Sequence, residues 1–67
     1  MKFNFKLTYL PEGDETLLKL LEFHQEIIQI KALYCNDEKH VALCSSKSLA
    51  KSLKVSKAIG AELEILF

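Results

Sequence analysis

The sequence predicts an α+β fold, a β-α-β-β-α-β sandwich in which a four-stranded antiparallel sheet carries two helices on one face. Four segments alternate apolar and polar residues with a period of two, which is typical of half-buried strands. Two further segments carry apolar residues at helical spacing behind candidate N-caps. Two right-handed crossovers around a central hairpin connect these elements in that order. We expect a single domain over residues 1–67.

The first strand is predicted over residues 2–10 and ends at the turn formers Pro11 and Gly13. Its polar side, with Lys2, Asn4 and Lys6, should face away from the helices. The first helix should begin at Asp14 as its N-cap and run about three turns. Its apolar stripe is Leu17, Leu20, Leu21 and His24, with His24 near the helix end.

The central hairpin is predicted from residues 27–35 and 40–44, joined by the polar turn 36–39. In a tight hairpin Tyr34 faces Val41 and Ala32 faces Leu43. Both pairs are apolar, so we expect them on the core side of the sheet. This orientation places Cys35 opposite His40 on the open face of the sheet.

The second helix should start near Ser45-Ser46 as N-cap and end near Ile59, with Gly60 in the left-handed conformation that follows many helices. The last strand is predicted over 61–67, with Leu63, Ile65 and Phe67 facing inward. The predicted core is Phe3, Phe5, Leu7, Leu17, Leu20, Leu21, Ile28, Ile30, Val41, Leu43, Leu49, Leu53, Leu63 and Ile65.

The element order resembles the ferredoxin-like superfold over the whole chain, and this resemblance is at the level of the fold alone. Heavy-metal-associated domains carry two close cysteines after the first strand, where this chain has Pro11-Glu12-Gly13. RNA-recognition motifs need aromatic residues on the open faces of the central strands, and acylphosphatases need an early arginine. Both features are missing from this sequence. ACT-type regulatory domains remain an open alternative.

The composition of the chain bears on which macromolecules it can bind and on its cellular compartment. Nine lysines and no arginine balance nine acidic residues, so net charge gives no general case for binding nucleic acid or an anionic membrane. The sequence has neither a signal peptide nor an apolar run long enough to span a membrane, which predicts a cytoplasmic protein. Two cysteines fit reduced thiols in that compartment.

Cys35, His40 and Cys44 are the residues with the most chemical potential. A thiolate and an imidazole can serve as two metal ligands, or as nucleophile and base. Cys44 lies too far along the strand from His40 to complete a metal site within one chain. Ordinary strand residues are the alternative, and we predict no catalytic residue, metal or cofactor. The Cys44–Ser48 segment lacks the glycines of a phosphate loop, so helix capping explains its serines.

Two surfaces are candidates for binding a macromolecule. Lys47, Lys51, Lys54 and Lys57 recur at helical spacing and form a lysine stripe, which is either a phosphate-tracking surface or a solvated face. The second strand should be a sheet edge with unpaired backbone groups, suited to pairing with another chain. The residues of this candidate interface are Ile27, Gln29, Lys31, Leu33, Ala42 and Cys44.

These features predict a non-enzymatic binding or regulatory module that acts on a protein partner or on a second copy of itself. No acid, base and nucleophile converge in the sequence, and a chain of 67 residues has little room for a ligand pocket. A nucleic-acid binder that uses the lysine stripe is the alternative. A thiol or metal carrier is the third hypothesis. The sequence names neither the partner nor the pathway.

Overall fold

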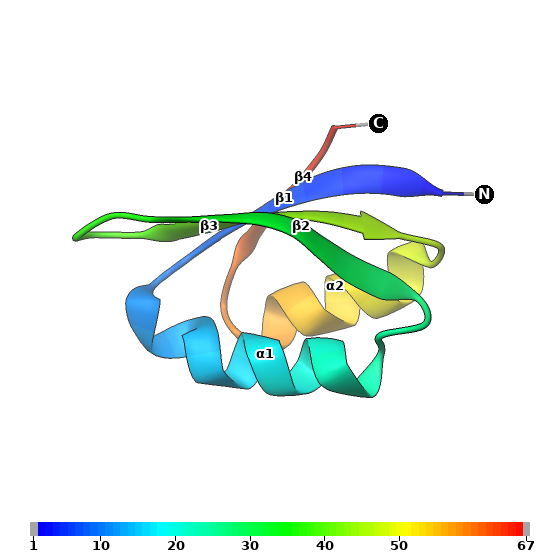
Figure 1. The fold of residues 1–67 in the computed structure, drawn as a ribbon, viewed down its shortest axis with the longest axis horizontal. Helices are drawn as coiled ribbons and strands as arrows, with labels where there is room; N and C mark the ends of the chain where they lie inside the picture. The colour runs from blue at the N-terminus through cyan, green and yellow to red at the C-terminus, as the bar shows by residue number, and fades with distance from the viewer. Residues whose placement is uncertain (1, 67) are drawn as a thin grey trace.

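A computed structural model describes residues 2–66 of the chain (Figure 1). The elements in order are β1 (Phe3–Tyr9), the 3-10 turn η1 (Pro11–Gly13), α1 (Asp14–Phe23), β2 (Ile28–Cys35), β3 (His40–Ser46), α2 (Leu49–Ala58) and β4 (Glu62–Ile65). The predicted order of strands and helices is therefore confirmed. The predicted inward position of Phe67 lies outside the described residues.

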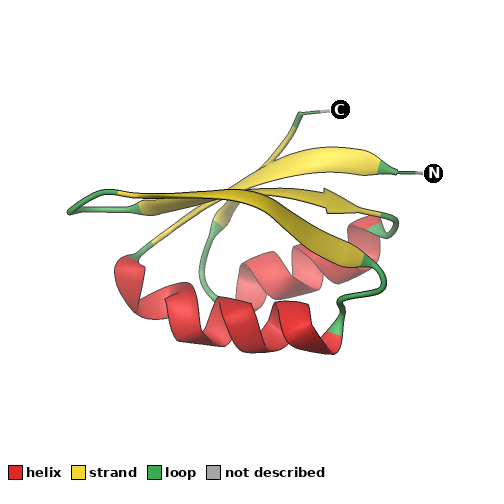
Figure 2. Ribbon diagram, viewed as in Figure 1, coloured by secondary structure: helices red, strands yellow, loops and turns green. Residues whose placement is uncertain are grey.

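The four strands form one antiparallel sheet in the order β2-β3-β1-β4, and both helices lie against the same face (Figure 2). This arrangement confirms an α+β fold and is compatible with a ferredoxin-like sandwich. β2 and β4 are the edges of the sheet. No helix within the described residues has the length and apolar character needed to cross a membrane.

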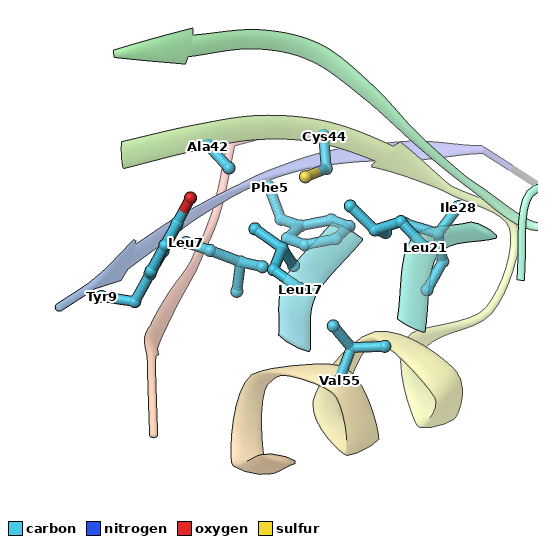
Figure 3. Close-up of a cluster of buried hydrophobic side chains, with 9 residues drawn as sticks. All are labelled: Phe5, Leu7, Tyr9, Leu17, Leu21, Ile28, Ala42, Cys44 and Val55. Atoms are coloured by element: carbon cyan, nitrogen blue, oxygen red, sulfur yellow. The ribbon is translucent and has the colours of Figure 1, made fainter. Parts of the chain in front are cut away.

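The core fills the space between the sheet and the helices. Leu17 and Leu21 of α1 and Val55 of α2 reach toward the underside of β1 and β3 (Figure 3). The buried apolar residues are Phe5, Leu7, Tyr9, Leu17, Leu21, Ile28, Ala42, Cys44 and Val55. Phe5, Leu7, Leu17, Leu21 and Ile28 confirm the prediction, while Phe3, Leu20, Ile30 and Leu63 pack against this cluster only partly buried.

The predicted orientation of β3 is wrong. Ala42 and Cys44 face the core, at 0% and 1% exposure, and they oppose Leu7 and Phe5 of β1. Val41 and Leu43 therefore lie on the open face, opposite Thr8 and Lys6. The small residues of β3 face inward because β1 already contributes large side chains at those levels. Close packing leaves no room for a second large residue there.

A β-bulge explains why the hairpin pairing was right and its face wrong. Tyr34 pairs with Val41 and Ala32 with Leu43, as predicted. The register shifts between Ile30 and Ala32, so one extra residue sits in β2 at that point. The residues on either side of the shift then lie on opposite faces. Ile28 points to the core, whereas Ala32 and Tyr34 share the open face with their partners on β3.

The predicted inner face of α2 is also wrong. Leu49 and Leu53 are 52% and 42% exposed, whereas Ser52 and Ser56 are 0% and 5% exposed. Val55 is the large apolar residue that α2 buries. Serines at i and i+4 present little bulk, which lets the helix backbone lie close to the sheet. Ile65 of β4, another predicted core residue, is 37% exposed.

The helix ends differ from the prediction in which residue caps them. The N-cap of α1 is Gly13 without a side-chain cap, and Asp14 is the first helical residue. Ser48 rather than Ser45 or Ser46 caps α2, and it accepts a hydrogen bond from the Lys51 amide at 3.3 Å. β3 runs through Ser46, which is why the helix begins later than predicted. Gly60 has φ 65°, as predicted for the residue that follows α2.

Candidate functional site

The outward side of α2 combines exposed leucines with lysines. We call Leu49, Lys51, Leu53, Lys54 and Lys57 the α2 surface. An open hollow of about 420 Å³ lies over it, lined by Ala50, Lys51, Leu53, Lys54 and Lys57. The hollow is shallow compared with a ligand pocket, so it suits a segment laid across the helix better than an enclosed small molecule.

The buried serines of α2 fix which side of the helix faces solvent. Ser52 donates its hydroxyl to the carbonyl of Ser48 at 2.8 Å, and Ser56 donates to the carbonyl of Ala61 at 2.9 Å. Each hydroxyl therefore enters the interior with a partner, which removes most of the cost of burying it. Leu49 and Leu53 are left outside because the serines occupy the inner positions.

Charge on α2 has one sign. Lys51, Lys54 and Lys57 lie on the helix without an acidic residue between Leu49 and Ala58. Lys51 also borders a second hollow of about 310 Å³ beside the end of α1, where Phe23 is 88% exposed. Leu53 and Ala50 lie among the three lysines of α2, and Glu26 lines the second hollow together with Lys51 and Phe23.

Lys47 stands apart from the other three lysines of the stripe. It lies between β3 and α2, and its backbone amide donates to the carbonyl of Ile27 at 3.0 Å. The hydroxyl of Ser46 accepts from the Ser48 amide and donates to the Ser48 carbonyl, both at 3.0 Å. Ser46 and Ser48 are therefore used in local hydrogen bonds, whereas the buried Ser45 hydroxyl takes no part in capping.

A network of three polar side chains joins β1, α1 and β3 beneath one end of the sheet. Tyr9 donates its hydroxyl to Asp14 Oδ1 at 2.6 Å. His40 Nδ1 lies 2.7 Å from Asp14 Oδ2, and the His40 side chain is only 13% exposed. The rings of Tyr9 and His40 meet edge to face with centroids 5.8 Å apart.

This network perturbs the ionisation of two of its members. The hydrogen bond from Tyr9, and then the close contact with His40, lower the pKa of Asp14 below its ordinary value, so this side chain is a carboxylate at neutral pH. Burial raises the pKa of Tyr9, and the hydrogen bond to Asp14 and the nearby charges of Asp14, Cys35 and Cys44 add to that effect. Tyr9 therefore remains a hydrogen-bond donor throughout the physiological range.

The two cysteines have opposite environments. Cys35 is exposed and pairs with His40 across the hairpin, as predicted, but on the side of the helices rather than the open face. Cys44 is buried, and burial raises the pKa of its thiol to about 11. Within residues 2–66, no three His, Cys, Asp or Glu side chains are grouped so that they could hold a metal ion.

The candidate interface at the β2 edge is only partly available. Ala42 and Cys44 belong to the core, so the structure removes them from this surface. Gln29, Lys31 and Leu33 are exposed along β2, which is an edge strand as predicted. The bulge interrupts this edge between Ile30 and Ala32. On the open face, Lys6 of β1 and Glu64 of β4 are strand partners and form an ion pair, with Nζ and Oε2 3.1 Å apart.

Sequence reasoning missed the network around Asp14. The sequence pattern predicts Asp14 as a helix cap and His40 on the open face, which places the two residues on opposite sides of the sheet. One signal was available. Tyr9 and Asp14 flank the same short turn, and a tyrosine on the inward side of a strand needs a partner for its hydroxyl when it is buried.

Comparison with known proteins adds no family to this description. No protein-family model matches the chain, and no curated protein shows a significant match to it. The functional interpretation therefore depends on the two features described above, the α2 surface and the network around Asp14.

Proposed function

We propose that the protein is a non-enzymatic interaction module that binds an acidic, amphipathic segment of a partner protein through the α2 surface. The observation that carries this proposal is the orientation of α2, whose leucines face solvent while its serines face the core. Burying a leucine side chain contributes roughly 1.5–3 kcal/mol. A chain of 67 residues that leaves Leu49 and Leu53 outside forgoes stabilisation that a partner can recover.

The lysines specify the chemistry of the partner. Lys51, Lys54 and Lys57 flank Leu53 without a compensating carboxylate on α2. A partner with carboxylates beside apolar side chains satisfies both kinds of group at once. A helix-in-groove or helix-on-helix contact gives the required spacing, because residues three and four apart share one face.

Two broader assignments go with this proposal. We infer a ferredoxin-like fold, which the element order and the placement of β1 between β3 and β4 support. We also infer a cytoplasmic protein, because two free cysteines are suited to a reducing compartment.

The test uses synthetic peptides of about 15 residues, long enough to form a helix on binding. Glutamate and leucine are placed at helical spacing in several registers, and fluorescence anisotropy measures binding to the whole protein. We expect at least one register to bind. The double variants Lys51→Glu/Lys54→Glu and Leu49→Ser/Leu53→Ser should each weaken it at least tenfold, since each removes one of the two complementary features.

The matched control carries the same change of charge elsewhere, with Lys2→Glu just before β1 and Lys31→Glu on β2. It should bind as the unmodified protein does. Circular dichroism of every variant establishes that it is folded. If no register binds at low salt, or if the control loses as much affinity as the α2 variants, the proposal is wrong.

Nucleic acid is the second candidate, favoured by the run of lysines without an acidic residue on α2. The exposed leucines argue against it, because they gain little from a phosphate backbone. Binding to single- or double-stranded nucleic acid should then weaken steeply with salt, since each phosphate contact releases counterions. Lys51→Glu/Lys54→Glu should abolish it. Absence of retention at low salt eliminates this candidate.

A further inference from the structure

Asp14 fixes the proton arrangement of His40. Its Oδ1 accepts a hydrogen bond from the Tyr9 hydroxyl at 2.6 Å, and its Oδ2 lies 2.7 Å from His40 Nδ1 in an ion-pair contact without hydrogen-bond geometry. A carboxylate oxygen and an unprotonated ring nitrogen would repel each other at this distance, so Nδ1 carries a hydrogen. In the neutral imidazole the basic lone pair is then on Nε2. Burial of the His40 side chain limits rotation of the ring away from this arrangement.

Cys35 stands next to that imidazole. It is the cross-strand partner of His40, and directly opposed residues on antiparallel strands have Cβ atoms about 4.5–5.5 Å apart. Directly opposed residues share one face of the sheet, so the thiol and the imidazole both lie on the helix side of the hairpin. Cys35 is exposed, so a reagent or substrate can reach it.

We propose that Cys35 is a reactive thiol, with His40 as its base and Asp14 and Tyr9 as positioning residues, and that it exchanges with small disulfides of the glutathione class. His40 Nε2 accepts the thiol proton, and the Cys35 thiolate attacks one sulfur of the disulfide. A new sulfur–sulfur bond forms and the original one breaks. The second sulfur leaves as a thiolate and takes the proton from the imidazolium. Cys35 is oxidised to the mixed disulfide and the leaving thiol is the reduced product.

The other cysteine provides an internal comparison. Cys44 is covered by the core and has no imidazole opposite it, since its strand partners are Phe5 and Ile30. The modification should therefore be confined to one of two thiols in the same chain. It would place the adduct at the end of β2, beside the start of α1 and away from the α2 surface. It is thus independent of the proposed protein partner.

The experiment measures the rate at which the folded protein reacts with oxidised glutathione, with intact mass reporting the adduct and peptide mapping its position. A second series uses iodoacetamide, which is uncharged and alkylates thiolates. We expect a single adduct on Cys35 in both. His40→Ala should slow both reactions about tenfold, because a positioned base is lost. Added imidazole should restore much of the His40→Ala rate, which a purely structural role for His40 would not permit.

Matched controls come from the chain itself. His24→Ala removes the only other histidine and should leave both rates unchanged. Tyr9→Phe keeps the packed ring but frees Asp14, so it should slow the reaction less than His40→Ala does. Equal rates for the unmodified protein and His40→Ala, or modification of Cys44 as fast as Cys35 in the folded state, would overturn the assignment.

Discussion

A single carboxylate, Asp14, links three elements that are far apart in the sequence. Placed one residue inside the helix rather than at its N-cap, it accepts a hydrogen bond from Tyr9 of β1 and lies 2.7 Å from His40 Nδ1 of β3. Its negative charge is still favourable in the first turn of α1, where the helix dipole is positive. The same residue therefore anchors the start of the helix beneath the sheet and orients His40.

Tyr9→Phe should lower the free energy of unfolding by about 1 kcal/mol at pH 7. It removes one hydrogen bond to an ionised, partly exposed carboxylate and keeps the buried ring. The folded-state pKa of Asp14 is depressed below its ordinary value of 3.8, so this stabilisation is present above that pH. It is lost as the pH falls through the depressed pKa. Urea unfolding of both proteins at pH 7 and at pH 3 measures the difference, which should shrink in acid. A difference that is the same at both values contradicts this role.

Cys44 predicts a loss of stability in alkali. Burial raises its folded-state pKa to about 11 from an ordinary value of 9.0, so the unfolded chain loses this proton first. The free energy of unfolding is therefore unaffected by this thiol below pH 9. Above pH 9 it falls by about 1.4 kcal/mol per pH unit for one proton. Cys44→Ala lacks this thiol, so its free energy of unfolding, measured with urea, should fall less steeply between pH 9 and 10. Tyr9 contributes with the same sign only above its ordinary value of 10.0. Identical pH slopes for the two proteins would exclude Cys44 as the source.

At the scale of elements, sequence pattern predicts the order and type of every strand and helix but misplaces two faces. The period-two alternation of β1 is unambiguous, because its two sides differ completely in polarity. β3 is apolar on both sides, with Val41 and Leu43 on one and Ala42 and Cys44 on the other. Hydrophobicity alone then favours Val41 and Leu43 for the core side of β3. In the structure Ala42 and Cys44 face the core, because the space beside Phe5 and Leu7 of β1 accommodates only small side chains.

The bulge in β2 has no local signature in the sequence. Gly often marks such a site, and this one falls between Ile30 and Ala32 with a lysine between them. Without the bulge, the correct pairing of Tyr34 with Val41 puts both on the core side. The error at His40, and hence the missed contact with Asp14, follows from that one extra residue.

The orientation of α2 can be tested with two matched truncations. Val55→Ala should lower the free energy of unfolding by about 2 kcal/mol, because this side chain is 1% exposed in the core. Leu53→Ala should cost less than about 1 kcal/mol, because the side chain is largely outside and alanine is a good helix former. Chemical unfolding gives both values. A larger loss for Leu53→Ala than for Val55→Ala would restore the orientation that the sequence predicts.

For the whole molecule, the two sheet edges and the helix layer offer different routes to self-association. The β4 edge has four residues, and the β2 edge is interrupted by a bulge next to the exposed Lys31. Short strands, bulges and lysines all discourage strand pairing between chains. The helix layer is complementary to itself. α1 carries Glu15, Glu22 and the exposed Leu18 and Phe23, with Lys19 Nζ 3.6 Å from Glu15 Oε1, whereas the α2 surface is basic.

In the absence of the partner segment, we therefore expect a two-fold dimer in which α1 of each protomer packs on the α2 surface of the other, and the partner segment competes with this contact. The contact is isologous, since one rotation creates both helix pairs, and it covers exposed leucines on both chains. Because its charges remain near solvent, it should weaken as salt screens them.

Sedimentation at tens of micromolar in low salt should give an average mass above one chain that rises with concentration. Lys51→Glu/Lys54→Glu and Glu15→Lys/Glu22→Lys should each be monomeric, since each places like charges across the contact. An equimolar mixture of these two variants should form some heterodimer, because the unmodified α1 of one variant can still pack on the unmodified α2 surface of the other.

Leu33→Lys at the β2 edge is the control and should dimerise normally. If Leu33→Lys alone abolishes the dimer, the chains pair through β2. A mass of one chain at every concentration leaves the α2 surface free for a different protein.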